Sequence, residues 1–456
     1  MRRTLLLITA LALCCGTLQA KDLDLKKCGA RADGKTKVTK VLQKAIDDIS
    51  ASGGGRLTVS GGTFLVTPFE LKSGVELHID ADAVLLASPD LADYPERTDV
   101  RHYDSAAMPR FRNVSLIYAD EARDIAITGR GVIDCNGTCF TMPKEGDDWT
   151  GWHFVRTVPR KQSLPRVVFF AGCTDVTVTD VTMRNQPAGW SYWIHDCDRV
   201  HFDNCKILAD VRYPNNDGIH LNCSRDVTVS DCIIVTGDDS IVIRANSRSL
   251  NENKACERVV ITNCTLRSWS AAVRLAWTND GVIRNCVLSN LVIHDSSKGV
   301  SIDLPEYTAR NPQDASNDYG REATLIENIS FSNILMDKVF YPVYARIHTN
   351  PEVLVSAIRN LSFIDMQCKS LYYPYLQGRK DCPIEDVVFR GCRFMRLTPD
   401  LMPDVKRHGA VPKRTTEQFV HVQRLSFEGC TFSYTGDFDF RNDYDWNVAD
   451  QRPKEQ

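Results

Sequence analysis

The sequence carries little net charge, and apart from the segment at its N-terminus it has no long apolar run. Its 55 Lys and Arg against 58 Asp and Glu give a formal charge of −3. That balance lacks the basic excess expected of a nucleic-acid-binding protein. No later segment offers the roughly 20 uninterrupted apolar residues of a transmembrane helix. No CxxC pair suggests zinc, and no amphipathic helices separate the strand-like segments as βαβ units would require.

The N-terminal segment 1–20, "MRRTLLLITALALCCGTLQA", has two arginines, an apolar run and small residues ending at Ala20. This pattern predicts a secretory signal peptide spanning 1–20 and an exported protein, periplasmic or extracellular. Lipid attachment at Cys14 or Cys15 is the alternative, but Leu13 and Cys14 are poor residues to precede a lipidated cysteine. Residues 21–456 show no interdomain linker and are expected to form one domain.

Removal of the signal peptide leaves 15 of the 17 cysteines. Many of them stand before a strand-like segment, where cysteine usually serves as a small buried apolar residue. This reading is favoured over a disulfide framework. A local disulfide between Cys135 and Cys139 in "DCNGTC" is one open possibility.

From about residue 111 one phrase recurs, with an Asn or Asp, alternating strand residues, and another Asn or Asp. Examples are "TDVTVTDVTMRN", "RDVTVSDCII" and "ERVVITNCTL". Short strands that repeat at intervals of one short coil or more, with polar turns between them, are typical of a parallel β-solenoid. A β-propeller is the alternative, but its blades need about 40 residues and hairpin turns. We therefore predict an all-β fold, a parallel β-helix.

The open ends of such a stack need covers. Residues 37–50 place Val38, Val41, Leu42, Ile46 and Ile49 at helical spacing, which predicts a capping helix at the N-terminal end. The glycines at 53–55 are expected to end this helix. The aromatic tail at 434–448 is a candidate cover for the other end.

Three aspartates interrupt buried strand patterns, Asp217 in "NNDGIHL" and Asp238 and Asp239 in "TGDDSIVI". Asp217 precedes the acid pair by the length of one short coil, so we expect the three side chains to share one patch. Crowded carboxylates raise one another's pKa, and a glycosidase needs one protonated and one ionised carboxyl. A calcium site and simple turn chemistry are the alternatives. Asp203, Asp231 and Asp295 are expected to serve turns only.

The segment "NNDG" followed by "GDDS" resembles the N-x-D-G and D-D signatures of polygalacturonase-type enzymes, glycoside hydrolase family 28. "GRGVIDCNG" resembles the family's G-x-G-x-I-D-G, and the likeness runs from about residue 28 to 305. The resemblance implies a right-handed parallel β-helix and hydrolysis with inversion. It also implies that Asp238 is the general acid and that Asp217 and Asp239 hold and deprotonate the attacking water. A carboxyl separation of roughly 6.5–9.5 Å would be expected for that water.

Two departures from the family pattern concern the substrate. Ala271 in "SAAVRLAW" stands where the family has a histidine, and "SID", with Ser301 and Asp303, stands where it has R-I-K. Losing two cations and gaining an anion disfavours plain polygalacturonate. A rhamnogalacturonan-type or side-chain linkage is favoured instead.

Further candidates for substrate binding surround the acids in the predicted coil. Asn215 belongs to the "NNDG" signature, and His220 is expected to face outward and could replace the missing histidine. The complete set is Asn215, His220, Arg244, Arg274, Trp277 and Lys298, with Tyr307 a weaker candidate. Trp190 and Trp193 could also stack on sugars, although strand alternation predicts that at least one lies in the core.

The sequence therefore predicts an exported, monomeric glycoside hydrolase that cleaves a pectic or related plant cell-wall polysaccharide, or its oligosaccharides. No cofactor or metal is expected. Exo action is a hypothesis that depends on the long loop at 138–165. A non-catalytic carbohydrate-binding solenoid and a calcium-dependent polysaccharide lyase are the alternatives.

Overall fold

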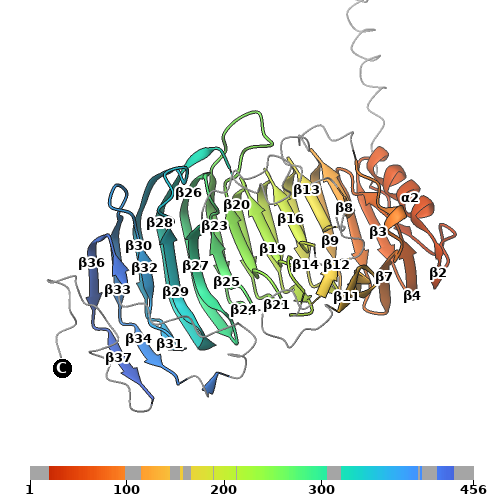
Figure 1. Cartoon of the computed structure of the whole chain (residues 1–456). Coiled ribbons are helices and arrows are strands. Elements are labelled where there is room, and N and C mark those ends of the chain that lie inside the picture. The colour runs from red at the N-terminus through yellow and green to blue at the C-terminus, as the bar shows by residue number, and fades with distance from the viewer. Residues whose placement is uncertain are drawn as a thin grey trace, which may run out of the picture.

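The computed structural model describes residues 20–97, 114–143, 155–157, 166–187, 189–211, 213–305, 320–398, 401–402 and 418–435, with only the backbone at 141–143 and 155–157. These residues form a stack of parallel β-coils that follow one another in sequence order (Figure 1). The predicted right-handed parallel β-helix is confirmed, and the propeller alternative is wrong. Among the described residues, no helix is long and apolar enough to cross a membrane.

One face of the stack is an 11-stranded sheet in which each strand pairs in register with the strand one coil away. Its strands are β5 (Phe69–Glu70), β8 (Ser115–Asp120), β13 (Arg166–Ala171), β16 (Tyr192–His195), β19 (Ile219–Asn222), β22 (Ile241–Arg244), β25 (Ala271–Leu275), β27 (Lys298–Leu304), β29 (Tyr341–Ile347), β32 (Tyr375–Gln377) and β35 (Phe419–Val420).

The other faces form two ladders of a 24-stranded sheet, joined where β26 and β28 run through both. The first ladder contains β1 (Leu23–Asp24), β3 (Gly55–Val59), β6 (Val75–Ile79), β9 (Arg123–Thr128), β14 (Thr174–Thr179), β17 (Asp198–Asp203), β20 (Arg225–Ser230), β23 (Cys256–Thr262), β26 (Asp280–His294), β28 (Glu322–Val339), β30 (Val355–Ile364), β33 (Ile384–Arg390) and β36 (Val422–Glu428). The second also contains β2 (Asp33–Lys37), β4 (Gly62–Val66), β7 (Ala83–Ala87), β10 (Val132–Asp134), β15 (Thr182–Arg184), β18 (Lys206–Leu208), β21 (Ile233–Thr236), β24 (Thr265–Ser268), β31 (Gln367–Ser370), β34 (Arg393–Arg396) and β37 (Thr431–Tyr434).

Four short elements of the described chain also lie outside these ladders. Two 3-10 turns are η1 (Leu91–Asp93) and η3 (Gly137–Phe140), and β11 (Thr141–Pro143) pairs antiparallel with β12 (Val155–Thr157).

Asparagine and aspartate side chains mark the corners between the two ladders. Asn204, Asn290 and Asn333 have φ angles of 51°, 55° and 50°, a left-handed backbone that Asn and Asp tolerate better than most residues. Asn333 donates to Asn290 across one coil at 2.8 Å, and Asn204 donates to Asp180 at 2.7 Å. The recurring Asn or Asp of the sequence therefore serves both the corner geometry and the bonding between coils.

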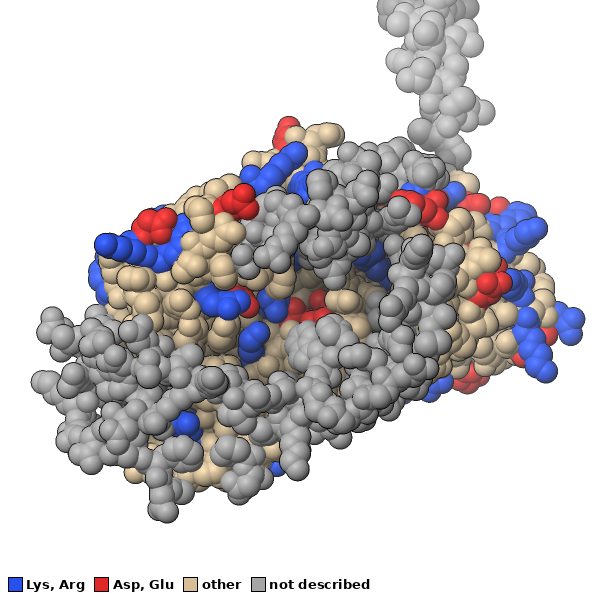
Figure 2. All heavy atoms as spheres, viewed as in Figure 1, with Lys and Arg blue, Asp and Glu red and all other residues tan. Residues whose placement is uncertain are grey.

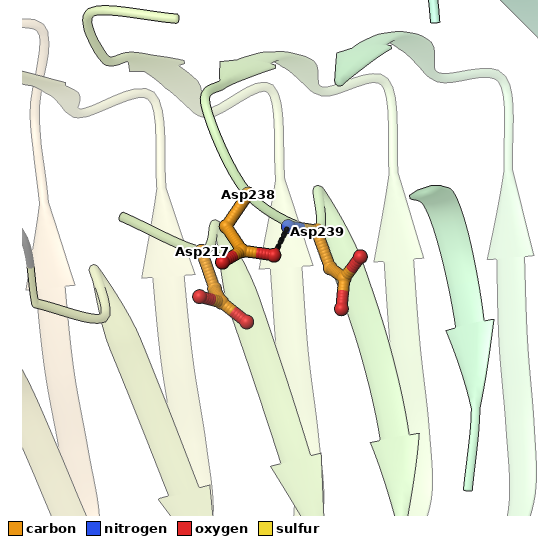
Figure 3. Close-up of side chains that lie close together, drawn as sticks. All are labelled: Asp217, Asp238 and Asp239. Carbon is orange, nitrogen blue, oxygen red and sulfur yellow. Dashed lines mark hydrogen bonds between the residues drawn. The ribbon is translucent and has the colours of Figure 1, made fainter. Parts of the chain in front are cut away.

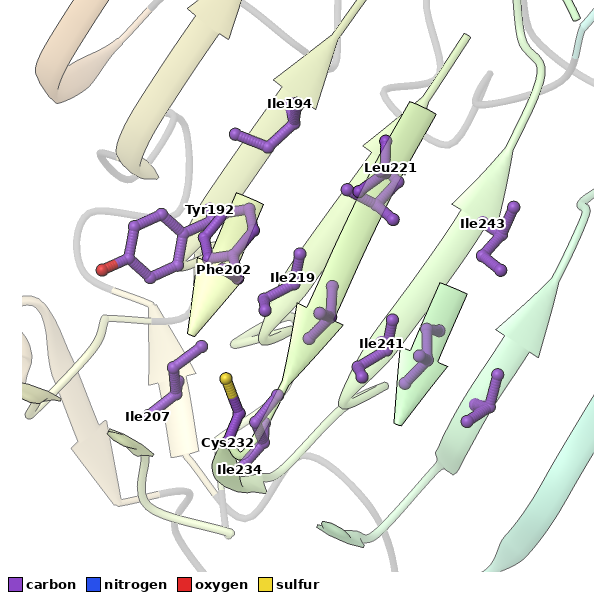
Figure 4. Close-up of a cluster of buried hydrophobic side chains, with 14 of the residues drawn as sticks. Tyr192, Ile194, Phe202, Ile207, Ile219, Leu221, Cys232, Ile234, Ile241 and Ile243 are labelled. Carbon is purple, nitrogen blue, oxygen red and sulfur yellow. The ribbon is translucent and has the colours of Figure 1, made fainter. Parts of the chain in front are cut away.

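The interior is filled by aliphatic and aromatic side chains stacked from coil to coil, such as Ile219 and Leu221 on β19 and Ile241 and Ile243 on β22 (Figure 4). One continuous cluster of buried residues runs from Leu25 to Leu425.

The cysteines that the structure describes are mostly small buried residues without disulfide bonds, as predicted. Most are buried and none of the 15 in the described part is bonded to another. The local disulfide considered between Cys135 and Cys139 is absent, because Cys135 lies in the core whereas Cys139 is exposed.

The predicted capping helix is α2 (Thr39–Ala51), which lies at the N-terminal end of the stack (Figure 1). It buries Leu42, Ala45, Ile46 and Ile49. At the turn that follows, Gly55 has φ 140°, and a Cβ there would meet Lys21 O at 2.2 Å. Only glycine fits so close a backbone approach. The tail proposed as the second cap, apart from its first two residues, lies outside the described residues.

Candidate active site

The three aspartates meet on the 11-stranded face, as the coil length predicts (Figure 3). Asp217 precedes β19, and Asp238 and Asp239 precede β22, the next strand of that sheet. The amide of Gly218 donates to the carbonyl of Asp239 at 2.9 Å, which fixes the two segments side by side. One carboxylate oxygen from each aspartate lies within 4.8 Å of the other two. Figure 2 shows acidic and basic side chains together in a hollow of this face.

Hydrogen bonds from the two segments hold Asp238 in place. Its Oδ2 accepts from the backbone and side-chain amides of Asn215 at 3.1 and 3.4 Å, and its Oδ1 accepts from the amide of Asp239 at 3.0 Å. Asn216 Oδ1 accepts from the amides of Gly237 and Asp238 at 2.7 and 3.1 Å. The two asparagines of "NNDG" thus orient the acid of the next coil, and Asn215, predicted to bind substrate, contacts Asp238.

The glycine before the acid pair is a steric requirement. A Cβ at Gly237 would meet the carbonyl oxygen of Tyr213 at 2.1 Å. The glycine therefore allows the loop before β22 to lie against the loop before β19, and this contact brings Asp238 toward Asp217.

Asp239 is bound from the following coil. The amide of Ala271 donates to its Oδ1 at 3.0 Å, and Nε of Arg274 donates to its Oδ2. Arg274 is on β25 and also lies over the ring of Trp277, with 4.8 Å from the guanidinium carbon to the ring centroid. Both residues were predicted to bind substrate; in the structure Arg274 binds Asp239, and Trp277 lies against the guanidinium of Arg274.

The pKa values of the acids are split by their surroundings. Burial raises the pKa of Asp238 to about 6, and Asp239 adds to this while Arg274 opposes it. Burial, followed by repulsion from Asp238 and Asp239, raises the pKa of Asp217 well above its ordinary value. In the described part of the chain Asp217 Oδ1 has no hydrogen-bond partner. The geometry thus provides a carboxyl that keeps its proton and a carboxylate tied to a cation, as acid–base catalysis requires.

The contacts of Asp238 and Asp239 disfavour the two alternatives, a calcium site and a turn role. Both oxygens of Asp238 accept from N–H donors and Asp239 is bound by Arg274, so the trio already has donors that a calcium site would have to displace. The turn reading fits other residues. Asp231 is exposed with φ 57°, and Asp203 accepts from Ser230 at 2.8 Å.

Arg244 faces outward from β22, as its place in the strand predicts, but its guanidinium is already bound. Nε and Nη2 donate to the two oxygens of Asp280 at 2.8 and 2.6 Å, and Arg244 is 4% exposed while Asp280 is fully buried. This arrangement gives Arg244 a structural role in place of the predicted contact with substrate. The sequence could not distinguish it from Arg274, because both arginines alternate outward in neighbouring coils.

His220 lies outside the coil interior, as expected, since Ile219 and Leu221 point inward. Its ring lies 3.8 Å from that of Trp190, centroid to centroid. Trp190 and Trp193 both belong to a separate aromatic cluster with Tyr118 and Phe169. Both tryptophans are buried, so the prediction that at least one lies in a core is confirmed. Their cluster is separate from the coil interior, and Trp190 precedes β16, where strand alternation does not apply.

Lys298, at the start of β27, directs its ammonium toward the ring of Tyr344, 4.9 Å from the centroid. Burial, together with the nearby Arg274, lowers the pKa of Lys298. Tyr307 and most of the loop at 138–165 lie outside the described residues.

Sequence reasoning missed the groups that surround Ser301 and Asp303. Asp303 accepts from Arg346 at 2.9 and 3.3 Å, so the repulsion expected from this carboxylate is offset. The register of β27 and β29 pairs Ser301 with Tyr344 and Asp303 with Arg346. These partners are 43 residues apart, far beyond the short coil length, and the repeat alone could not identify them.

Comparison with known proteins assigns the family. The sequence model of Glycosyl hydrolases family 28 matches residues 102–352. The chain belongs to this family. The match begins later and ends later than the resemblance drawn from the motifs, and it contains all three aspartates.

Two curated relatives of this family 28 chain illustrate the likeness. A probable polygalacturonase of Vitis vinifera is 29% identical over 295 residues, covering 62% of the chain and 57% of the relative. An exo-poly-alpha-D-galacturonosidase of Dickeya chrysanthemi is 26% identical over 323 residues, covering 62% of the chain and 52% of the relative. The chain thus matches little more than half the length of either relative.

Solved structures agree with the fold of the family 28 chain. A Thermotoga maritima exopolygalacturonase has a TM-score of 0.66 at 22% identity, covering 83% of this chain and 88% of that one. A Yersinia enterocolitica family 28 exopolygalacturonase has a TM-score of 0.68 at 19% identity, covering 92% and 76%. At these identities the likeness establishes the shared β-helix.

Proposed function

We propose that this protein is an exported glycoside hydrolase that cleaves glycosidic bonds in pectic or related plant cell-wall polysaccharides or their oligosaccharides. Asp238 donates a proton to the leaving oxygen, and Asp217 and Asp239 hold and deprotonate the attacking water. The observation that carries this proposal is the contact of three buried carboxyls, of which Asp239 has a bound arginine while Asp217 and Asp238 have raised pKa values.

Inversion is proposed from the family, because the spacing of the acids does not indicate it. Inverting enzymes typically separate their carboxyls by about 6.5–9.5 Å and retaining enzymes by about 5–5.5 Å. The carboxylate oxygens of this trio approach within 4.8 Å of one another. The stereochemical outcome is therefore a measurement that the proposal requires.

The charges beside the acids support an acidic sugar in the substrate. Arg274 is bound to Asp239, and Lys298 and Arg346 lie in the next two coils of the same sheet. Ala271, Ser301 and Asp303 replace family residues, which favours a rhamnogalacturonan-type linkage over plain polygalacturonate. His220, Trp277 and Lys298 are the proposed substrate-side residues, whereas Asn215 and Arg274 contact Asp238 and Asp239. Residues 1–20 are proposed to be a signal peptide and 21–456 one domain, acting as a monomer without a cofactor.

The proposal is tested by incubating the protein with polygalacturonate, methyl-esterified pectin, rhamnogalacturonan oligosaccharides and a neutral galactan, and analysing the products by mass spectrometry. Products that gain one water are expected from at least one pectic substrate. Unsaturated products that absorb in the ultraviolet would indicate a lyase instead. Binding without any product would indicate the non-catalytic solenoid.

A further inference from the structure

Arg274 occupies a distinctive place in the sheet that carries the acids. On β25 its neighbours Val273 and Leu275 point into the interior and are fully buried, so Arg274 faces outward. The register sets it between Val242 of β22 and Ser301 of β27. The same strand carries Ala271, which stands where the family has a histidine.

Arg274 and its own strand hold both oxygens of Asp239. Nε of Arg274 donates to Oδ2, and the amide of Ala271 donates to Oδ1 at 3.0 Å. Both side chains are nine-tenths buried, at 8% and 7% exposed. The ring of Trp277 supports the guanidinium from one side. A buried carboxylate with two donors and a cation has a fixed orientation and a stabilised charge.

Other charged side chains lie near the Arg274–Asp239 pair, and the cations among them contact other residues. The charged side chains near this pair are Asp217, Asp238, Lys298, Asp303 and Arg346. Asp303 is bound by Arg346, and Lys298 is directed at the ring of Tyr344. Within the described part of the chain, Arg274 is the cation that forms an ion pair with the trio.

We infer that Arg274 is a positioning residue, which holds Asp239 as an oriented carboxylate toward the attacking water. This inference rests on the proposed function and adds to it the residue that orients Asp239. Without Arg274 the three carboxyls would compete for the proton, because like charges so close cannot all ionise. With Arg274 in place, the charge and orientation of Asp239 are stabilised by a bound cation.

The test is the pH dependence of kcat/KM for Arg274→Gln and Arg274→Lys on a substrate that the wild type cleaves. In Arg274→Gln the trio of carboxyls loses the cation bound to Asp239, which disfavours ionisation of the trio. We expect the acidic limb of the profile to move up by about one pH unit. At the optimum, kcat should fall about 100-fold while KM changes less than about threefold. Arg274→Lys keeps the charge and should return the limb to within about half a pH unit of wild type.

Arg244→Gln is the matched control, because it also removes a buried arginine that binds a buried aspartate. Arg244 lies on β22, the strand next to the one that carries Arg274. It is expected to lower stability and to leave both limbs where they are. A double-mutant cycle supplies a second test. If Arg274 acts through Asp239, Arg274→Gln should cost little further activity in an Asp239→Asn background. If Arg274→Gln does not fold, the cycle is performed with Arg274→Met, which removes the charge and keeps most of the aliphatic side chain.

Three outcomes would overturn the inference. They are an equal loss of rate at every pH, a rise in KM with unmoved limbs, or additive effects in the cycle. A fully active Asp238→Asn would instead overturn the proposed function. An inactive Asp238→Asn together with an unmoved acidic limb in Arg274→Gln would overturn the inference and leave the proposed function standing.

Discussion

One carboxylate oxygen of Asp217 lies within 4.8 Å of one of Asp238, although the two residues belong to consecutive coils. Both residues are more than nine-tenths buried. Two buried carboxyls at this distance hold a proton more tightly than isolated ones. This contact, with Arg274 bound to Asp239 beside it, is the basis of the predictions below.

The first prediction concerns stability. Burial raises the pKa of Asp238 from 3.8 to about 6 in the folded state. The folded protein therefore loses stability as pH rises between these values, since the unfolded chain gives up its proton first. Asp238→Asn should raise the free energy of unfolding at pH 7 by about 1–3 kcal/mol. Urea denaturation at pH 4 and pH 7 measures this difference, which should be small at pH 4. Equal stability of both proteins at pH 7 would contradict the raised pKa.

The second prediction is the basic limb of the activity profile. Because the general acid must carry its proton, kcat/KM should decline as pH rises through about 6, the pKa of Asp238. The apparent value belongs to the coupled pair rather than to one residue. Initial rates across pH 4–9 measure the limb. A rate that stays constant to pH 9 would show that no group of the trio donates a proton.

The third prediction is stereochemical. We expect the first product to have the anomeric configuration opposite to that of the substrate, as in a single displacement. Proton NMR of the reaction mixture in its first minutes, before mutarotation, reads the anomer directly. Retention would show that one of the three aspartates acts as a nucleophile, which the short oxygen separations also permit.

The fourth prediction separates a buried ion pair from an exposed one. Arg244→Met leaves the fully buried Asp280 without its cation, which should cost about 3–5 kcal/mol of unfolding free energy. Arg199→Met is the control, because Arg199 pairs with Asp175 at an exposed position, and it should cost less than about 1 kcal/mol. Chemical denaturation of both variants gives the comparison. Equal costs would show that Asp280 is adequately solvated without Arg244.

The fifth prediction concerns metal. The carboxylates of Asp238 and Asp239 already accept from N–H donors. Dialysis against a chelator should therefore leave the rate within about 20% of its starting value, since the acid–base assignment needs no ion. A lyase or a calcium-supported site would lose activity and regain it on addition of calcium, and such recovery would contradict the assignment.

The fold and the meeting of the acids could be predicted because both follow from the length of a coil. The alternation in "VTVTDVTM" identifies strands with one buried face, and a separation of one short coil sets Asp217 beside Asp239. The capping helix was predictable from its apolar spacing. The sequence could not predict which side chains bind one another.

Arg244 and Arg274 illustrate this limit. Both face outward from neighbouring strands, yet one binds Asp280 and the other binds Asp239. The choice depends on the loop after β25, which brings Asp280 back to Arg244, and no repeat encodes it. Asp303 and Arg346 were missed for a related reason, since a long insertion separates their coils. Trp190 and Trp193 are both buried, as predicted for at least one of them, but strand periodicity could not show that they form a cluster separate from the coil interior.

The most direct test of the central claim is kcat for Asp238→Asn beside Asp231→Asn, on the best substrate found in the product screen. Asp231 occupies an exposed turn with φ 57°, where asparagine is equally suited. The account predicts that Asp238→Asn lowers kcat by about 10²–10⁴-fold, and that Asp231→Asn has no effect. An Asp238→Asn protein that turns over as fast as the wild type would contradict it.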